Sequence, residues 1–135
     1  MANRAAYTEA GPWLAEALSY LDGNRHALQQ ALHELAPLVG YRAPEGTYLA
    51  WLDLRAALDV RSGASQADDA PEWARADPGD LERWIRRQTG LAVTDGASCG
   101  EAGRGFVRLN LAMPRPMVVE AARRIAECLD GRTGA

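Results

Sequence analysis

The chain has 135 residues, enough for one domain with a hydrophobic core of its own. Hydrophobic residues make up 47% and charged residues 24%, the balance of an ordinary globular domain, and the net charge of −3 disfavours a general nucleic-acid binder. Two cysteines are too few for a disulfide scaffold, and no apolar run approaches the roughly 18 residues of a membrane span. The N-terminal segment has no apolar stretch of the kind found in secretion signals. We therefore expect a cytoplasmic protein.

The basic residues exclude one kind of chemistry. All fifteen are arginine, and the chain contains no lysine. A Schiff base with a carbonyl cofactor and a P-loop both require a lysine amine, so this chain supplies neither. We therefore expect no catalytic lysine and no covalently bound cofactor here.

The N-terminal region is predicted to be helical from Pro12 to Pro37. Asp22-Gly23-Asn24 interrupts the apolar pattern, so two helices with Asn24 as an N-cap and one long helix bent at Gly23 both fit. The apolar residues that recur at helical spacing are Trp13, Leu14, Ala17, Leu18, Leu21, Leu28, Ala31, Leu32 and Leu35.

Two strands are predicted next, at 39–42 and 47–54, joined by a turn at 43–46. The longer strand is apolar on both faces. Leu49 and Trp51 lie on one face, and Ala50, Leu52 and Leu54 lie on the other. A strand of this kind is normally covered on both faces, and we expect the same here.

Residues 59–79 read as a long polar loop that Trp73 could pin. Asp80 is a candidate cap for the following helix, which should end near Gly90. The apolar side of that helix is predicted to contain Leu81, Trp84, Ile85 and Gln88.

The rest of the chain predicts a strand at 91–94, a glycine-rich loop at 95–105, an alternating strand at 106–112 and a helix between Pro114 and Gly131. The predicted buried stripe of this helix is Val118, Val119, Ala122, Ile125, Ala126 and Leu129. The elements predict a single α+β domain over 1–135. It has a mainly antiparallel sheet of about three to four strands with helices on one face, preceded by the long N-terminal helical region.

Arg108 is the candidate binding residue. It lies in the alternating strand, on the same face as Asn110, behind the glycine-rich loop. A guanidinium group matches a carboxylate with two parallel hydrogen bonds, and a strand fixes its geometry. The alternative is a structural ion pair on an exposed sheet face.

Other candidate sites favour ordinary structural roles. The glycine-rich run at 100–105 leads into a strand, so it lacks the helix N-terminus of a phosphate loop and is predicted to be a flexible connection. His26 and His33 have no third donor nearby, which disfavours a metal site.

The cysteines and the arginine doublets are interpreted in the same way. Cys99 could be exposed but has no identifiable base, and Cys128 is predicted to be a packed thiol. The doublets Arg86-Arg87 and Arg123-Arg124 are predicted to lie on solvated helix faces.

Three segments form a set in order along the chain: the WLxxxLxYLxGNR-like region from Trp13 to Arg25, the PEGTYLAWLD stretch at 44–53 and the GFVRLNxAxPR-like stretch at 105–115. Together they resemble pyridoxal-phosphate (PLP) enzymes of the cystathionine β-lyase type, C–S lyases of the class I/II aminotransferase superfamily. Two features depart from the family pattern. The loop at 59–79 is longer, and Cys99 stands where many relatives carry an aromatic residue.

The resemblance implies that the chain corresponds to the C-terminal small domain, without the larger domain that carries the PLP lysine. In the family, the arginine of the VRLN motif holds the α-carboxylate of the substrate, a role that maps onto Arg108. The implied reaction of the parent enzyme converts cystathionine to homocysteine, pyruvate and ammonia, with PLP as cofactor, and the chain alone is expected to be inactive.

Two alternatives to the lyase remain open: the C-terminal domain of an amino-acid aminotransferase, and a free-standing, non-enzymatic module that binds a carboxylate or a partner. A domain built to pack on a larger one should also expose an apolar interdomain face. Trp13, Leu14 and Tyr48 are its candidates, and we expect self-association through this face.

Overall fold

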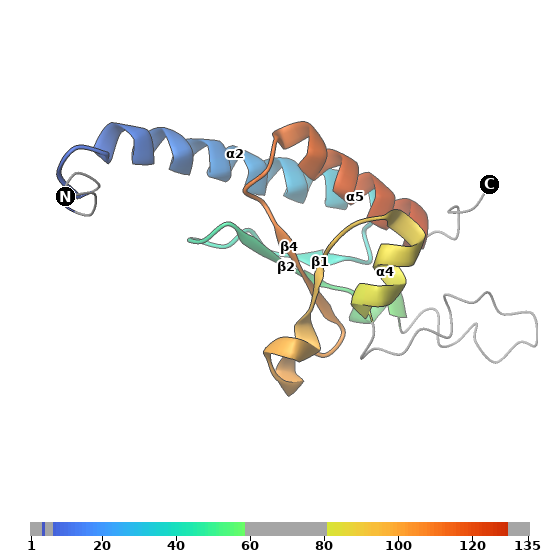
Figure 1. Ribbon diagram of the computed structural model, residues 1–135. Coiled ribbons are helices and arrows are strands. Elements are labelled where there is room, and N and C mark those ends of the chain that lie inside the picture. Colours follow the sequence, from blue (N-terminus) through green and yellow to red (C-terminus); the bar gives the residue numbers. More distant parts are fainter. Residues whose placement is uncertain (1–3, 5–6, 59–80, 130–135) are drawn as a thin grey trace, which may run out of the picture.

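The computed structural model describes residues 4, 7–58 and 81–129 (Figure 1). The predictions for the loop at 59–79, Trp73, the Asp80 cap and Gly131 lie outside these residues. The elements are α2 (Gly11–Leu35), β1 (Gly40–Tyr41), β2 (Leu49–Asp53), α4 (Leu81–Thr89), β3 (Thr94–Asp95), the 3-10 turns η2 (Gly96–Cys99) and η3 (Glu101–Gly103), β4 (Phe106–Asn110) and α5 (Arg115–Leu129).

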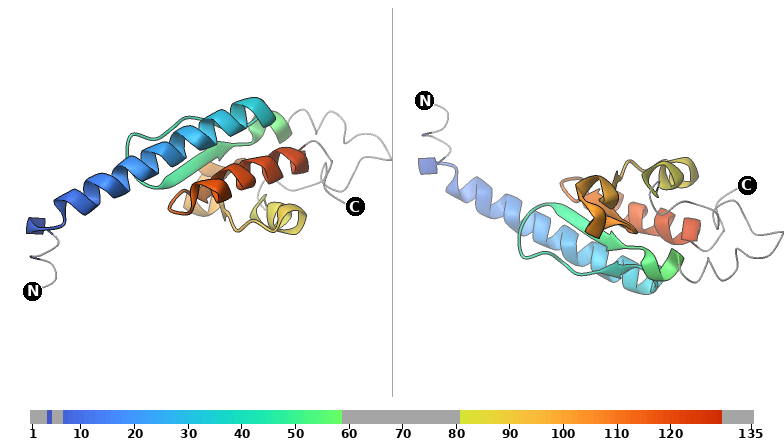
Figure 2. Two further views of the ribbon diagram at one scale, coloured as in Figure 1. Left: turned by 90° about the horizontal axis from the view of Figure 1, so that it is seen from above. Right: turned by 90° about the horizontal axis from the view of Figure 1, so that it is seen from below.

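The strands form one antiparallel sheet in the order β1-β2-β4-β3. α2 and α5 lie side by side on one face of this sheet, and α4 packs beside them against α5 and β4 (Figures 1 and 2). This arrangement confirms the predicted α+β fold with helices on one face. The predicted strand at 91–94 begins too early, because only Thr94 and Asp95 pair with β4.

α2 is one continuous helix, so the reading with two helices is wrong. Pro12 lies in its first turn, as predicted. The helix runs through Gly23 without a break. A Cβ atom at this position would collide with Nη2 of Arg115 and lie 2.9 Å from its Cζ, so the Arg115 guanidinium would have to move. The first part of α2 extends beyond the rest of the molecule (Figures 1 and 2). We call residues 11–20 of α2 the overhang.

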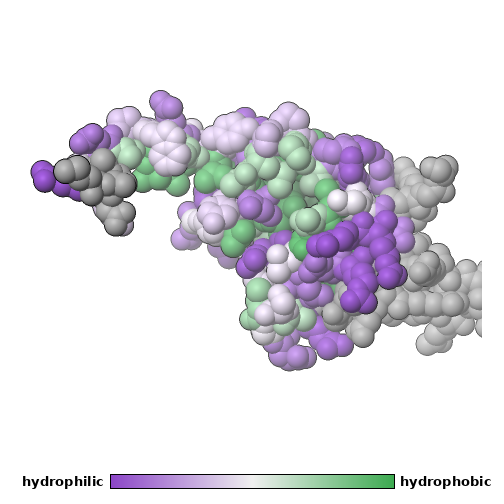
Figure 3. Space-filling view, in the orientation of Figure 1, coloured by the Kyte–Doolittle hydropathy of each residue, from purple (hydrophilic) through white to green (hydrophobic). Residues whose placement is uncertain are grey.

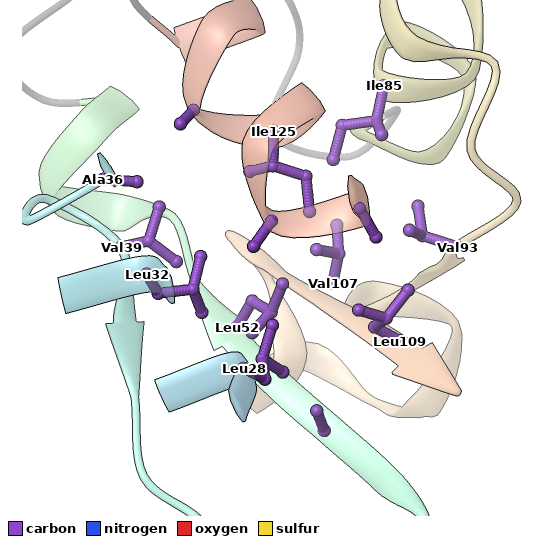
Figure 4. Packing of buried hydrophobic residues seen from close by; sticks show 14 of the residues in the cluster. Leu28, Leu32, Ala36, Val39, Leu52, Ile85, Val93, Val107, Leu109 and Ile125 are labelled. Atoms are coloured by element: carbon purple, nitrogen blue, oxygen red, sulfur yellow. The ribbon is translucent and has the colours of Figure 1, made fainter. Parts of the chain in front are cut away.

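The core lies between the helices and one face of the sheet. Leu28 and Leu32 of α2 meet Leu52, Val107 and Ile125 there, and all five are almost completely buried (Figure 4). These residues come from four elements that are distant in sequence, so the core joins both ends of the described chain.

Covering of both faces of β2 was expected, but the described residues cover only one of them. Ala50, Leu52 and Leu54 are buried, whereas Trp51 is 40% exposed. The sequence places apolar residues on both faces of this strand, but among the described residues only the helix side is packed.

Two predicted helix faces are also corrected. On α5, Val119 is exposed and Ala121 and Cys128 are buried, because the contact face follows the spacing of Val118, Ala121, Ala122 and Ile125. On α4, Thr89 rather than Gln88 completes the buried face, and Gly90 ends the helix at φ +71° as expected.

The glycine-rich loop at 95–105 is more regular than predicted. It forms η2 and η3 instead of a simple flexible connection. Asp95 caps η2 by accepting a 2.8 Å hydrogen bond from the Ala97 backbone, and its other carboxylate oxygen accepts from Leu81 N at the start of α4. The backbones of Gly96 and Gly103 lie so close together that a side chain on either would collide with the other.

Candidate functional site

Arg108 lies at the centre of the open face of the sheet. β4 pairs with β2 and β3, so that Trp51 is directly across from Arg108 on one side and Thr94 on the other. Alternation along β4 buries Val107 and Leu109 on the helix side and leaves Arg108 half-buried on the open side. Arg108 therefore stands between Trp51 and Thr94 in one row across the sheet.

Among the described residues, the Arg108 guanidinium makes one side-chain hydrogen bond. It is a long one, 3.4 Å from Nη2 to Thr94 Oγ1. Asp53 lies on the same face but pairs with Arg55, whose Nη2 and Nε lie 2.6 and 2.9 Å from its carboxylate oxygens. Within the described parts of the chain, Arg108 makes no ion pair, so the structural ion-pair interpretation finds no support there.

Aromatic side chains flank this charge. Trp51 and Phe106 form an edge-to-face pair with ring centroids 6.2 Å apart, and the Arg55 guanidinium lies 4.7 Å from the Phe106 centroid. The hydrogen bonds from Arg55 hold the pKa of Asp53 below its usual range, so this carboxyl stays charged and occupied with Arg55. Among the described residues, no carboxylate is therefore paired with Arg108.

A second group of residues holds the ends of the strands, and sequence reasoning missed its role. Asn24 and Arg25 are 0% and 6% exposed, unusual for polar residues. They bind backbone carbonyls next to β4 and β2, and Arg115 of α5 donates to Asn24. The signal was available, since all three residues belong to the quoted motifs.

The remaining candidates follow the structural interpretations. His26 and His33 are exposed, Cys99 is exposed, and Cys128 is buried as predicted. The two arginine doublets are exposed, and Arg123 and Arg124 pair with Glu120 on the same helix. In the part of the chain that the structure describes, no three or more His, Cys, Asp or Glu side chains are grouped to hold a metal ion.

The overhang carries exposed apolar side chains. Trp13 is 69% exposed and Leu14 is 51% exposed, and Leu18, Tyr20 and Tyr48 are also exposed, as expected for Trp13, Leu14 and Tyr48. Hydrophobic atoms are visible along this arm in the space-filling view (Figure 3). No helix within the described residues has the length and apolar character to cross a membrane.

Comparison with known structures defines the class of this fold. The PLP-bound C-S lyase from Staphylococcus hominis matches 93% of this chain with 29% of its own, at a TM-score of 0.73 and 25% identity. A PLP-bound aminotransferase candidate from Clostridium difficile matches 93% of this chain with 28% of its own, at a TM-score of 0.74 and 31% identity. The fold is thus that of one part of a larger PLP enzyme.

Sequence relatives narrow the class. A candidate cystathionine beta-lyase of Mycobacterium tuberculosis is 36% identical over 129 residues, which are 96% of this chain and 31% of that protein. Protein MalY of Escherichia coli is 34% identical over 114 residues, 84% of this chain and 25% of MalY. No family model matches.

These relatives confirm the resemblance: the chain corresponds to a C-terminal part of proteins of the cystathionine β-lyase type. It spans about a third of the length of the curated relatives it matches.

Proposed function

We propose that this chain is the substrate-carboxylate-binding domain of a PLP-dependent C–S β-lyase, and that Arg108 holds the α-carboxylate of the amino-acid substrate. One observation carries the proposal. Arg108 keeps its guanidinium group on the open sheet face without a described acidic partner, although Asp53 lies on the same face.

Two parallel hydrogen bonds from Arg108 to the carboxylate would fix both the position and the plane of that group. Because Arg108 is on the central strand β4, its backbone is held on both sides by pairing with β2 and β3. A substrate gripped in this way has little freedom to rotate, which lowers the entropic cost of reaching a reactive geometry.

The cofactor does not fit on this chain alone. With no lysine in the sequence, the chain has no amine that could hold PLP covalently. In the whole enzyme, PLP would be held by a part outside this chain and would supply the electron sink for bond cleavage at the substrate. The contribution of this chain is to bind and orient the substrate, and by itself it is inactive.

The parent reaction would convert cystathionine to homocysteine, pyruvate and ammonia in the cytoplasm. An aminotransferase is the second candidate, because an aminotransferase structure matches as well as the lyase structure does. The two differ in their products: a lyase releases a thiol and pyruvate without an amino acceptor, whereas an aminotransferase needs a 2-oxo acid.

The test uses the whole enzyme that contains this chain. Arg108→Ala should lower kcat/KM by roughly one to two orders of magnitude, as expected for losing hydrogen bonds to a charged group worth about 1.5–3 kcal/mol. Arg108→Lys should restore only part of the loss, because an ammonium group cannot form the planar bidentate contact. The exposed Arg86, paired with Glu82 on α4, is the matched control, and Arg86→Ala should leave kcat/KM unchanged.

An Arg108→Ala enzyme with unchanged kcat/KM would remove Arg108 from the binding site. A free-standing module would be favoured instead if the gene contains no lysine-bearing domain in frame upstream of Met1.

A further inference from the structure

Asn24 and Arg25, which are buried, and Arg115, which is exposed, form a clamp at one end of the β2–β4 pair. Asn24 Nδ2 donates to the carbonyls of Leu111 and Met113, each at 2.9 Å. Its Oδ1 accepts a 3.1 Å hydrogen bond from Arg115 Nε, so the amide of Asn24 is engaged at both of its atoms. The clamp therefore fixes the exit of β4 against the middle of α2.

Arg25 fixes the neighbouring strand from the next position of the helix. Its Nη2 donates to the Thr47 carbonyl at 2.5 Å, just before β2, where Thr47 has the unusual φ of +65°. Leu111 N donates to Tyr48 O at 2.7 Å and joins the two held segments. Both strands are thus tied to two consecutive residues of α2.

The clamp lies close to Arg108 along the strand. Leu111 is three residues beyond Arg108, about 10 Å at the rise of an antiparallel strand. On the other side, α2 continues without a break into the overhang, whose apolar side chains are exposed. One rigid helix therefore connects the overhang to the exit of the strand that carries Arg108.

We propose that the clamp is a positioning device for Arg108, in which Asn24 and Arg115 set the place of β4 relative to α2. This proposal rests on the proposed function of Arg108. When the overhang docks on the rest of the enzyme, the clamp determines the position of the Arg108 guanidinium relative to the docked part.

Gly23 offers a substitution that disturbs the clamp without weakening the helix. A Cβ atom at position 23 would displace the Arg115 guanidinium, whereas alanine is the better helix former. Gly11 is the matched control on the same helix, because a Cβ atom there meets nothing within 4 Å. Gly23→Ala should therefore release Arg115 from Asn24, and Gly11→Ala should leave the clamp intact.

The first measurement is amide hydrogen exchange by NMR on the 135-residue chain. Gly23→Ala should speed exchange of the Leu111 amide by roughly tenfold or more without lowering the melting temperature, whereas Gly11→Ala should leave that amide unchanged. Equal exchange at Leu111 in both variants would overturn the clamp as a local constraint.

The second measurement is a double-mutant cycle in the whole enzyme. Gly23→Ala should raise KM more than it lowers kcat and reduce kcat/KM by roughly tenfold, but it should have less than a twofold effect when Arg108 is already alanine. An equal loss in both backgrounds would mean that the clamp does not act through Arg108, and no loss in the native background would also overturn the proposal.

The outcomes distinguish failure of the proposed function from failure of the positioning role alone. If Arg108→Ala alone has no effect on kcat/KM, the proposed function fails and so does positioning for catalysis. If Arg108→Ala has its expected effect but Gly23→Ala does not, only the positioning role fails.

Discussion

Removing one apolar side chain from the overhang should weaken self-association of the isolated chain. Leu14 is 51% exposed on the overhang, and Leu38 is 47% exposed just beyond the other end of α2. Leu14→Gln therefore removes an apolar side chain near the start of α2, and Leu38→Gln removes a similar one just beyond its end. Only the first change affects the surface that would face the rest of the enzyme.

The size of the effect follows from the exposed fraction. Fully burying a leucine side chain is worth about 1.5–3 kcal/mol, and half of Leu14 is still exposed, so covering it gives about 1 kcal/mol per copy. In a symmetric dimer both copies lose this contribution, about 2 kcal/mol in total, which raises the dissociation constant roughly thirtyfold.

Sedimentation velocity over a roughly hundredfold concentration range measures this directly. The native chain and Leu38→Gln should show the same rise in sedimentation coefficient with concentration, and Leu14→Gln should need a higher concentration. A strictly monomeric native chain at millimolar concentration, or equal weakening by both variants, would refute the role of the overhang.

Three further outcomes are expected. Burial raises the pKa of Tyr41 to about 12, and the charge of Arg25 partly opposes this shift. The stability that the neutral Tyr41 contributes is present below about pH 10 and is lost as the pH rises toward 12. An ultraviolet titration should show one tyrosine that ionises later than the others, and Tyr41→Phe should remove that late step. Hydrogen bonds from Arg55 lower the pKa of Asp53, so this carboxyl contributes stability that is present above about pH 4 and lost as the pH falls. In Arg55→Gln, the free energy of unfolding should therefore change less steeply with pH in this acid range. Borohydride reduction in the presence of PLP, followed by intact-mass measurement, should add no group to an internal side chain, since the chain has no lysine.

The periodic parts of the sequence predicted the fold well, because burial on one side imposes a repeat that can be read locally. The alternation of Val107, Arg108 and Leu109 gave both the strand and the open position of Arg108. Pro12 and Gly90 marked helix ends correctly, because their backbone preferences are local.

Contacts between distant segments could not be predicted in this way. Gly23 suggested a break in the helix, and only the structure shows that Arg115 approaches it from the start of α5. Likewise, the polar side chain of Asn24 suggested a helix cap, but its hydrogen bonds go to carbonyls at the far end of the chain. In both cases the physical reason lies in tertiary packing: the motifs mark these residues, but the local pattern does not show which distant groups they contact.

The open face of β2 is an informative part of the comparison with the sequence. Trp51 predicted a strand covered on both sides, which holds only if something outside the described residues covers the second face. The pattern is consistent with the short coverage of the relatives, since about two thirds of their length has no counterpart in this chain.

The most direct test of the central claim is a crystal structure of the whole enzyme with an unreactive amino-acid analogue bound. Two nitrogen atoms of the Arg108 guanidinium should each lie about 2.7–2.9 Å from an oxygen of the analogue's α-carboxylate. A structure in which that carboxylate is bound by other residues, with Arg108 still directed at Thr94, would contradict the account.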